Sequence, residues 1–406
     1  MLRIKAFAGL RPAPELVTEV ACVPYDVVNT PEAAKLAEGL PNSLLHVDRA
    51  EIDLPTGTDP YSDVVYDKAR ENFLRLQSKG ALIRETEPTI YLYQQRMGNH
   101  VQTGLAAVCH IEDYEKDIIK KHEKTRRDKE DDRTRLIGTL RADTGPVFLT
   151  YRDLPEIDRL VGAALKAAPL YDFTAPDAIQ HTVWRVAGGE RFVEEFTRVP
   201  LAYVADGHHR TASACRVGRE LRAANPQHSG TEDYNWFLAV LFPASQLQIL
   251  PYNRTVKDLN GHSPESFLQA ISKVFVLTKN GSPTSSHAGQ IGMYLAGNWY
   301  HLEWQPAPDS DPISQLDVTA LQDRLLSPIL GIDDPRTSKR IDFIGGIRGT
   351  DELLKLVDLG TAAVAFSMVP TTVAQLMAIA DAGQIMPPKS TWFEPKLRSG
   401  LFIHTF

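Results

Sequence analysis

The chain has 406 residues, more than one hydrophobic core usually serves, so two or three lobes are expected. Hydrophobic residues make up 43% and charged residues 23%, which are ordinary values for a soluble globular protein. The net charge of −7 argues against a general nucleic-acid binder, because nothing offsets the repulsion from phosphate backbones. A local basic pocket for a small anion is not excluded.

Cysteines and apolar runs bear on the compartment of the protein. Cys22, Cys109 and Cys215 lie far apart and form no CxxC pair, which favours a reducing compartment over a disulfide scaffold. The N-terminus lacks the apolar run of a signal peptide, and the most apolar stretches, 236–242 and 362–369, are too short to cross a bilayer. We therefore expect a cytoplasmic protein without a membrane or nucleic-acid partner.

Strands and helices alternate along the chain without a regular βα period, which favours an α+β fold over a doubly wound sheet. Thr30-Pro31-Glu32 and Asp59-Pro60 have the chemistry of helix starts, with a capping residue and a proline. In the first third of the chain, the sequence predicts a strand within 2–23, helices over 30–40 and 60–79, strands over 89–95 and 102–110 joined by a turn at Gly98-Asn99, and a highly charged stretch over 112–140. The middle is expected to contain strands over 147–151, 182–186 and 200–205, helices over 154–167 and 211–224, and paired strands over 236–242 and 248–253. The last part is expected to contain helices over 262–274, 317–326, 351–357 and 370–380, a hairpin over 291–304, a strand over 362–368 and a terminal strand over 401–406.

The strongest local signal is the turn Asp206-Gly207-His208-His209-Arg210, which follows a short apolar strand and opens a helix. Helix N-termini offer free backbone N–H groups and a favourable dipole to anions, and Arg210 can bind phosphate oxygens bidentately. Asp206 can cap the helix, bind a metal or take a proton from a hydroxyl. The alternative is a capped helix start whose histidines face solvent or satisfy each other. Adjacent histidines do not share a helix face, so a zinc site is not expected.

A second group of polar residues lies near the C-terminus. Lys389, Ser390 and Lys396 follow or flank prolines that stiffen the segment, and lysine is a compact positive charge suited to a terminal phosphate. The alternative is a surface loop with ordinary solvated lysines.

The charged run 120–135 is typical of a solvated helix face with ion pairs between successive turns. A functional interpretation takes from it an acid or base and phosphate-binding cations. On the residues alone, His122-Glu123 is the part that we single out.

Tyr25, Asp26 and His46 stand at the edges of apolar sequence, where a small polar substrate can be gripped. For Asp26 a plain turn residue is the alternative. The sequence contains no Gly-x-x-x-x-Gly-Lys-Ser/Thr loop, no Gly-x-Gly-x-x-Gly fingerprint and no Gly-x-Ser-x-Gly elbow. Neither a P-loop, a dinucleotide site nor a serine hydrolase is therefore supported.

Over nearly its whole length the chain resembles the bacterial and archaeal family known as domain of unknown function 1015. Members of this family look like serine kinases that use inorganic pyrophosphate as phosphate donor. The resemblance rests on five segments in the family's order: Pro24-Tyr25-Asp26-Val27, 42–47, His122-Glu123-Lys124-Thr125, 205–210, and Met386-Pro387-Pro388-Lys389-Ser390-Thr391 with Pro395-Lys396-Leu397.

The turn 206–210 also resembles the phosphate-binding turn of sulfiredoxin and of free serine kinases with the ParB/sulfiredoxin fold. In sulfiredoxin the matching turn reads Gly-Cys-His-Arg, and its His and Arg contact nucleotide phosphates, a role that carries over to His209 and Arg210. His208 stands where the reactive cysteine would be, which excludes sulfiredoxin chemistry. The acid of the serine-kinase turn carries over to Asp206 as a catalytic or metal-binding residue.

The sequence departs from the family at two places. Cys22-Val23 replaces the usual prolines ahead of Pro24, and Asp143-Thr144-Gly145-Pro146 replaces a more usual Asn-x-Ser-Pro. Neither departure touches the expected phosphate ligands, but either can alter the acceptor.

Together, the residues and the resemblance imply an α+β protein with a ParB/sulfiredoxin-like lobe and a second mixed α/β lobe. Four segments are expected: an N-terminal α/β segment that completes the substrate cleft (1–85), a charged hairpin–helix lobe (86–180), a ParB/sulfiredoxin-like phosphate-binding core (181–255) and a C-terminal α+β lobe with the lysine loop (256–406).

The activity implied is transfer of a phosphoryl group from pyrophosphate, or from a nucleotide, to the hydroxyl of free L-serine, with Mg²⁺ as cofactor. Asp206 would be the base and a metal ligand, with Glu123 as the alternative base and His209 in a catalytic role. The expected phosphate ligands are His208, Arg210, Lys389, Ser390, Lys396 and Lys124, and the expected serine ligands are Asp26, Tyr25 and His46. The alternatives are a non-catalytic ParB-like regulator that binds nucleotide or phosphate, and a phosphatase. Apart from its small-molecule substrates, a second copy in a homodimer is left open as a partner.

Overall fold

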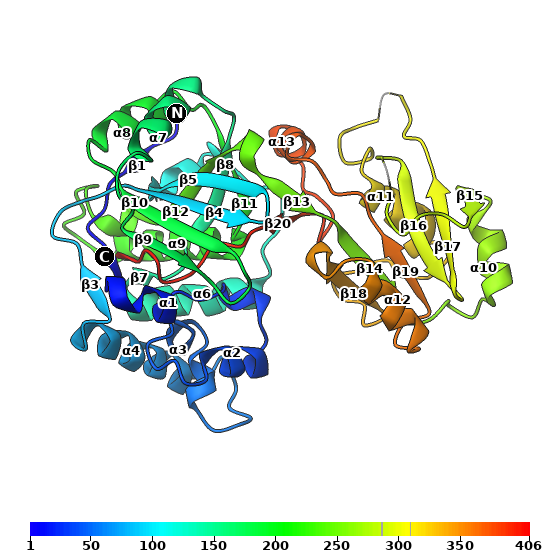
Figure 1. Ribbon diagram of the computed structural model, residues 1–406, viewed down its shortest axis with the longest axis horizontal. Coiled ribbons are helices and arrows are strands. Elements are labelled where there is room, and N and C mark those ends of the chain that lie inside the picture. Colours follow the sequence, from blue (N-terminus) through cyan, green and yellow to red (C-terminus); the bar gives the residue numbers. More distant parts are fainter. Residues whose placement is uncertain (286, 309) are drawn as a thin grey trace. The chain divides into compact units, whose positions relative to one another are not determined.

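The computed structural model describes residues 1–285, 287–308 and 310–406 and divides into two compact units (Figure 1). Unit 1 comprises Met1–Leu247 and Pro395–Phe406, and unit 2 comprises Gln248–Glu394. The boundaries expected near residues 85 and 180 both fall inside unit 1, and the boundary expected near 255 falls close to the junction after Leu247. The chain therefore leaves unit 1 and returns to it for its last residues.

Unit 1 is built on a mixed sheet in which antiparallel pairs dominate. Its strands are β1 (Ile4–Lys5), β4 (Tyr91–Met97), β5 (His100–His110), β6 (Ile119–Lys120), β8 (Val147–Tyr151), β9 (Tyr171–Thr174), β10 (Gln180–Arg185), β11 (Ala202–Asp206) and β12 (Trp236–Pro243). They follow the order β6-β11-β8-β12-β5-β4-β10-β9, with β1 paired to β5. Two pairs are parallel, β11–β6 and β12–β8. Because β6 and β11 run in the same direction, the segment after β6 lies alongside the end of β11.

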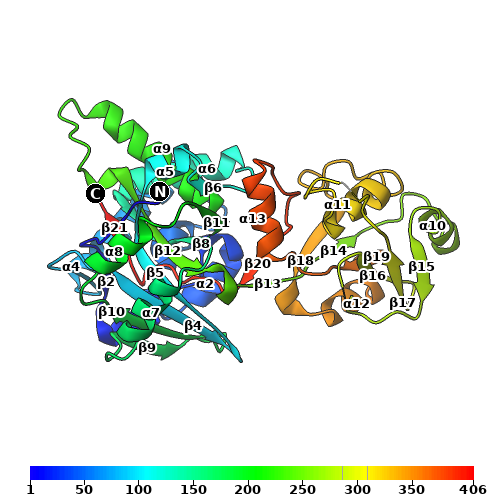
Figure 2. The same ribbon diagram turned by 90° about the horizontal axis from the view of Figure 1, so that it is seen from above.

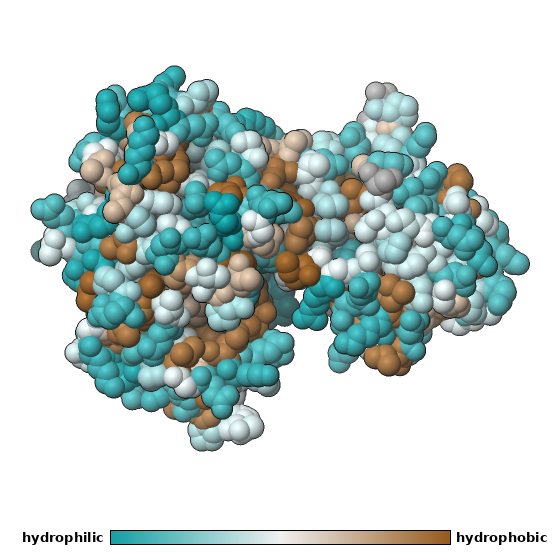
Figure 3. All heavy atoms as spheres, viewed as in Figure 1, coloured by the Kyte–Doolittle hydropathy of each residue, from teal (hydrophilic) through white to brown (hydrophobic). Residues whose placement is uncertain are grey.

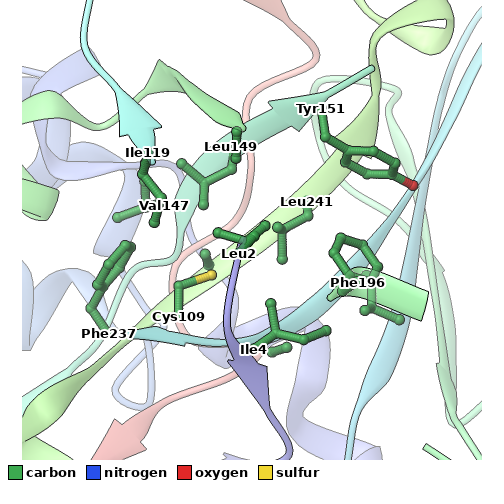
Figure 4. Packing of buried hydrophobic residues seen from close by; sticks show 14 of the residues in the cluster. Leu2, Ile4, Cys109, Ile119, Val147, Leu149, Tyr151, Phe196, Phe237 and Leu241 are labelled. Carbon is green, nitrogen blue, oxygen red and sulfur yellow. The ribbon is translucent and has the colours of Figure 1, made fainter. Parts of the chain in front are cut away.

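One face of this sheet carries the main hydrophobic core (Figure 4). On β12 the core residues are Phe237, Ala239 and Leu241, and on β5 one of them is Cys109, as expected where alternate side chains of a strand point to one face. Helices α7 (Pro155–Ala164), α8 (Glu190–Phe196) and α9 (His208–Ala224) also contribute side chains to this cluster. Full burial of each Leu or Phe stabilises the fold by about 1.5–3 kcal/mol, so this core holds the sheet, and with it the end of β11, in a fixed position.

The last residues of the chain cross the opposite face of the sheet. Tyr91 and Tyr93 of β4 lie 4.9 and 5.8 Å from the ring of Phe402, measured between ring centroids. The side-chain amide of Gln95 on the same strand donates a hydrogen bond of 2.8 Å to the backbone carbonyl of Lys396. Lys396 is therefore held against the sheet by its backbone, although it lies far along the chain from β4.

The remaining elements of unit 1 surround this sheet. A second apolar cluster joins N-terminal helices to part of α6. The elements are β2 (Leu10–Pro12), α1 (Val17–Val20), α2 (Thr30–Ala37), α3 (Leu45–Asp48), α4 (Asp63–Ser78), β3 (Leu82–Arg84), α5 (Ile111–Glu115), α6 (Arg127–Leu140), β7 (Ala142–Asp143) and β21 (His404–Thr405).

Unit 2 has an antiparallel sheet in the order β15-β17-β16-β19-β14-β18 (Figure 2). Its strands are β14 (Tyr252–Val256), β15 (Val276–Lys279), β16 (Gln290–Leu295), β17 (Asn298–Glu303), β18 (Ile341–Gly345) and β19 (Val364–Ser367), and β13 (Gln248–Leu250) pairs separately with β20 (Trp392–Glu394). The α-helices are α10 (Pro264–Ile271), α11 (Asp317–Leu321), α12 (Asp351–Asp358) and α13 (Val373–Asp381). Both units mix helices with largely antiparallel sheet, which confirms the expected α+β class.

Three local expectations were wrong. Asn29, not Thr30, caps α2, because its side chain accepts from the N–H of Glu32, whose own side chain accepts from the N–H of Asn29. The helix expected to open at Asp59-Pro60, α4, begins at Asp63 instead. The strands expected over 236–242 and 248–253 do not pair with each other: β12 pairs with β5 and β8, and β13 pairs with β20. An apolar run predicts a strand and its buried face but not its partner.

The face of the molecule seen in Figure 3 is largely hydrophilic, with apolar residues exposed in small groups. Exposed large apolar side chains include Leu74 in unit 1 and Val276 and Leu359 in unit 2. Apolar residues scattered in this way are normal on a protein surface. Within the described residues, no helix combines the length and the apolar character that crossing a membrane requires.

Candidate functional site

Asp206 is the last residue of β11, and an irregularity in the strand turns its side chain. Ala202 and Val204 belong to the core face of the sheet. The register of β11 against β8 then shifts between Val204 and Asp206, as in a β-bulge. Because a bulge inserts one extra residue, the next side chain changes face, so Asp206 points towards the C-terminal segment instead of following Val204 into the core. Its side chain remains 28% exposed.

The carboxylate of Asp206 lies between two cations. One oxygen, Oδ1, accepts a hydrogen bond of 2.8 Å from the N–H of Gly207, and the other, Oδ2, accepts one of 3.2 Å from Nζ of Lys396. The guanidinium of Arg210 lies 3.9 Å from Oδ2. Burial would raise the pKa of Asp206, but the charges of Lys396 and Arg210 outweigh it and hold the pKa below its ordinary value. Asp206 is therefore ionised at neutral pH.

Gly207 allows the tight turn between β11 and α9. Its φ is +93°, a left-handed conformation, and an added Cβ would lie 3.1 Å from the guanidinium carbon of Arg210. Arg210 is buried and donates to the carbonyl of Pro146, whereas its Nε has no hydrogen-bond partner in the described part of the chain. Burial opposes the charge of Arg210, but Asp26 and Asp206 raise its pKa above the ordinary value. The turn therefore presents a permanent cation at the N-terminus of α9.

The two histidines of the turn face the segment that follows β6. The rings of His208 and His122 meet edge to face, with centroids 4.4 Å apart. Burial lowers the pKa of both, for His122 to about 4, so both are neutral at pH 7. Nδ1 of His208 lies 4.0 Å from Oε2 of Glu123, and its Nε2 has no hydrogen-bond partner among the described residues. Nε2 of His209 accepts a hydrogen bond of 3.0 Å from the N–H of Arg126. His122 and Glu123, the part of the charged run that we singled out, therefore lie beside the turn, and their roles stay predictions.

Of the expected serine ligands, two lie near Arg210. The ring of Tyr25 is buried beneath the guanidinium of Arg133, 4.0 Å from the ring centroid, and lines a cavity of about 20 Å³ with Arg210. Asp26 is exposed, and its charge contributes to the raised pKa of Arg210. His46 instead lines another groove, of about 460 Å³, that includes no residue of the turn. Nδ1 of His46 lies 2.8 Å from the carboxylate of Asp53.

The remaining expected phosphate ligands lie in different parts of the chain. Lys124 is exposed in unit 1. Lys389 and Ser390 belong to unit 2: Nζ of Lys389 lies 5.6 Å from the ring centroid of Tyr252, and the hydroxyl of Ser390 donates to the carbonyl of Pro387 at 2.6 Å. Their roles in phosphate binding stay predictions.

A metal site was expected at Asp206. Among residues 1–285, 287–308 and 310–406, no group of three or more His, Cys, Asp or Glu side chains could hold an ion. A Mg²⁺ ion at this place would have Asp206 as its protein carboxylate ligand and would need its other ligands from water or a bound phosphate, so the metal role of Asp206 stays a prediction.

Helix α6 contains a pair of buried charges that was not predicted from the sequence. Asp132 and Arg133 are each 8% exposed, which corrects the interpretation of 120–135 as a solvated helix face for these two residues. A signal was present: Arg133 precedes Leu136 and Ile137 by three and four residues, the spacing that places side chains on one helix face.

Residues 4–319 match the protein family described as Protein of unknown function (DUF1015). The chain belongs to this family. The matched region includes β11, the turn 206–210 and the segment after β6, but not the lysines at 389 and 396. No curated protein matches the chain.

Three solved structures show a distant similarity, and each covers 73% of this chain. They are free serine kinase in complex with AMP (11% identity, TM-score 0.37, 91% of that chain covered), SbnI from Staphylococcus aureus (12%, 0.38, 86%) and a conserved hypothetical protein from Pyrococcus furiosus (11%, 0.37, 94%). These scores are too low to support an argument about fold or function. The ParB/sulfiredoxin-like character of the lobe stays a prediction.

Proposed function

We propose that the protein is a phosphotransferase that moves a phosphoryl group from pyrophosphate to the hydroxyl of free L-serine. The observation that carries this proposal is the ionised carboxylate of Asp206, held between Lys396 and Arg210 at the first turn of α9. The family resemblance on the same residues supports the choice of serine and pyrophosphate.

The charges at the turn suit a phosphate donor. Lys396 and Arg210 place two cations beside the carboxylate of Asp206, although the charge of Asp26 also reaches Arg210. A helix of 17 residues begins beside them with N–H groups that its own backbone does not use. His208 is neutral, and His209 accepts a hydrogen bond at Nε2. Each imidazole ring can therefore donate an N–H to a phosphate oxygen without adding charge. Mg²⁺ brought in with the donor phosphates would neutralise charge there.

The reaction requires one bond to form and one to break. The serine Oγ attacks a phosphorus of pyrophosphate, the bond from that phosphorus to the bridging oxygen breaks, and orthophosphate leaves. The hydroxyl proton passes to the carboxylate of Asp206, with Glu123 as the alternative acceptor. A low pKa makes Asp206 a weak base, which is sufficient because phosphoryl transfer depends mainly on positioning and charge neutralisation.

Pyrophosphate is favoured over a nucleotide because a nucleotide also needs an apolar or aromatic slot for its base. The aromatic residue nearest in sequence to the turn, Tyr203, is fully buried within β11, so its ring cannot stack on a base. A nucleotide donor is the second candidate.

The deciding experiment offers L-serine with pyrophosphate, ADP or ATP in separate reactions containing Mg²⁺ and measures phosphoserine. Phosphoserine formed with pyrophosphate is the expected result. Phosphoserine formed with ATP but not with pyrophosphate would refute pyrophosphate as the donor and leave the assignment as a serine kinase unchanged. Release of phosphate from phosphoserine with no forward reaction would indicate a phosphatase, and nucleotide or phosphate binding without any turnover would indicate a regulator.

A further inference from the structure

A separate cavity of about 120 Å³ lies in unit 1, lined in part by residues of α3, α4 and α6. This volume is larger than the ~30 Å³ that one water occupies in the liquid and smaller than the ~300–1,000 Å³ of pockets for drug-sized ligands. A ligand of the size of a small amino acid fits such a space, whereas a nucleotide does not.

The charged side chains of this cavity balance one another. Three carboxylates and three cations line it, namely Asp48, Glu51, Asp132, Arg49, Lys129 and Arg133, for a formal net charge of zero. The turn 206–210 differs, because Arg210 and Lys396 lie there at the start of a helix whose N–H groups also favour anions. Buried charges are costly unless they meet opposite charges, so a lining of both signs suits a ligand that also carries both signs.

The buried polar groups hold fixed positions. The carboxylate of Asp132 accepts from the hydroxyl of Tyr66 at 2.7 Å and from Nε of Arg133 at 2.8 Å. Nε of Arg49 lies 2.9 Å from the carboxylate of Glu51. The side chains of Asp132, Arg133 and Glu51 are each no more than 10% exposed. Such a preorganised set can recognise an ammonium and a carboxylate group together at little ordering cost.

The cavity adjoins the packing around Arg210. Tyr25, Asp48 and Arg133 line both this cavity and the small one that Arg210 lines. Arg133 donates to the backbone carbonyl of Asp48 at 3.3 Å. Burial raises the pKa of the Asp48 carboxyl, and the charges of Arg133 and Arg210 both oppose that rise, so both guanidiniums lie within electrostatic reach of it. A ligand in the cavity is therefore close to the groups that support the turn.

We propose that this cavity binds the ammonium and carboxylate groups of the amino-acid acceptor, with Asp132 and Glu51 facing the ammonium and Arg133 facing the carboxylate. The proposal rests on the proposed function for the identity of the acceptor. The cavity itself stands on its volume, its balanced charges and its buried side chains.

The test is calorimetric titration of L-serine into the full chain without a phosphate donor. Asp132→Asn should raise the Kd for L-serine by about 10- to 100-fold, because a charged hydrogen-bond acceptor is lost. Glu85→Gln is the matched control, since Glu85 is also a buried carboxylate that accepts from an arginine and a tyrosine, Arg11 and Tyr91, but does not line the cavity. Its Kd should equal that of the wild type.

A second variant protects the test against misfolding of Asp132→Asn. Ala69→Leu leaves every charge in place and adds apolar atoms to the cavity wall, so it should abolish L-serine binding while circular dichroism stays unchanged. Ethanolamine, which lacks the carboxylate, and 3-hydroxypropanoate, which lacks the ammonium, should each bind at least about tenfold more weakly than L-serine.

The outcomes separate this proposal from the proposed function. Absence of L-serine binding to the wild type, or equal Kd values for the wild type and Ala69→Leu, would overturn the cavity assignment even if phosphoserine is formed. Binding that is lost in Ala69→Leu, with no phosphoserine from any donor, would support the cavity and refute the kinase.

Discussion

Replacing Lys396 by Met removes one of the two cations at Asp206 and keeps a side chain of similar length. Nζ of Lys396 lies 3.2 Å from Oδ2 of Asp206, and the two side chains are only 16% and 28% exposed. A hydrogen bond to a charged group contributes about 1.5–3 kcal/mol, which corresponds to a fall of about 10- to 150-fold in kcat/KM for pyrophosphate. The loss should fall mainly on the donor, because Lys396 is not part of the cavity proposed for L-serine.

The same substitution should change the pH dependence. Without Lys396 the pKa of Asp206 rises towards its ordinary value, so the acid limb of the kcat/KM profile moves to higher pH. Because the folded-state pKa is depressed, ionised Asp206 contributes stability above its unfolded pKa of ~3.9, and this is lost as the pH falls through the folded value. The difference in free energy of unfolding between wild type and Lys396→Met should therefore be largest near neutral pH and shrink in acid.

The assay measures phosphoserine against pyrophosphate concentration from acid to neutral pH, together with urea unfolding at each pH. Lys5→Met is the control, because Lys5 also pairs with a carboxylate in unit 1, Asp233 at 2.7 Å, but lies away from the turn. An unchanged KM for pyrophosphate and an unshifted acid limb in Lys396→Met, as in Lys5→Met, would refute the reasoning.

Four further outcomes are expected. Asp206→Asn keeps an acceptor for the N–H of Gly207 but loses the charge, so phosphoserine formation should fall at least about a hundredfold while circular dichroism still shows a folded protein; near-normal turnover would leave Asp206 as a cap. Gly207→Ala should lower the free energy of unfolding in urea by about 1–3 kcal/mol, because φ is +93° and the new Cβ meets Arg210; a variant of wild-type stability would contradict this. Glu123→Gln should lower turnover less than about tenfold, and a larger loss would move the base to Glu123. EDTA should suppress phosphoserine formation, and undiminished turnover would remove Mg²⁺ from the proposal.

The sequence predicted those elements whose evidence is local. The strand over 147–151 has the observed bounds of β8, and the Gly98-Asn99 turn joins β4 to β5, where Met97 pairs with His100. Turn chemistry and period suffice for such elements. The pairing of β12 with β5 and β8 depends on contacts between segments distant in sequence, which no local pattern contains.

The candidate site divides in the same way. The turn 206–210 is one contiguous motif, so its position after a buried strand was readable from the sequence. The bulge that changes the direction of the Asp206 side chain was not readable, because the continuous apolar run 200–205 gives no sign of an extra residue before it. Lys396 entered the predicted site through the family resemblance and its lysine chemistry, and the structure places its Nζ on Asp206. Its role as a phosphate ligand stays a prediction.

The turn and the proposed acceptor cavity differ in charge, and this difference would let the protein bind pyrophosphate at one place and L-serine at the other. A pyrophosphate anion would be attracted to Arg210, Lys396 and the N-terminus of α9 but would gain little from a cavity whose charges cancel. A zwitterion has the opposite preference, because it can satisfy both signs in the cavity and carries no net charge to draw it to the turn. Arg133 and Tyr25 lie where the two regions meet, so substitution at either residue should affect both substrates, whereas Lys396→Met and Ala69→Leu should each affect one. If Lys396→Met weakened the binding of L-serine as strongly as that of pyrophosphate, the two substrates would share one site, and this division of charge could not explain the selection.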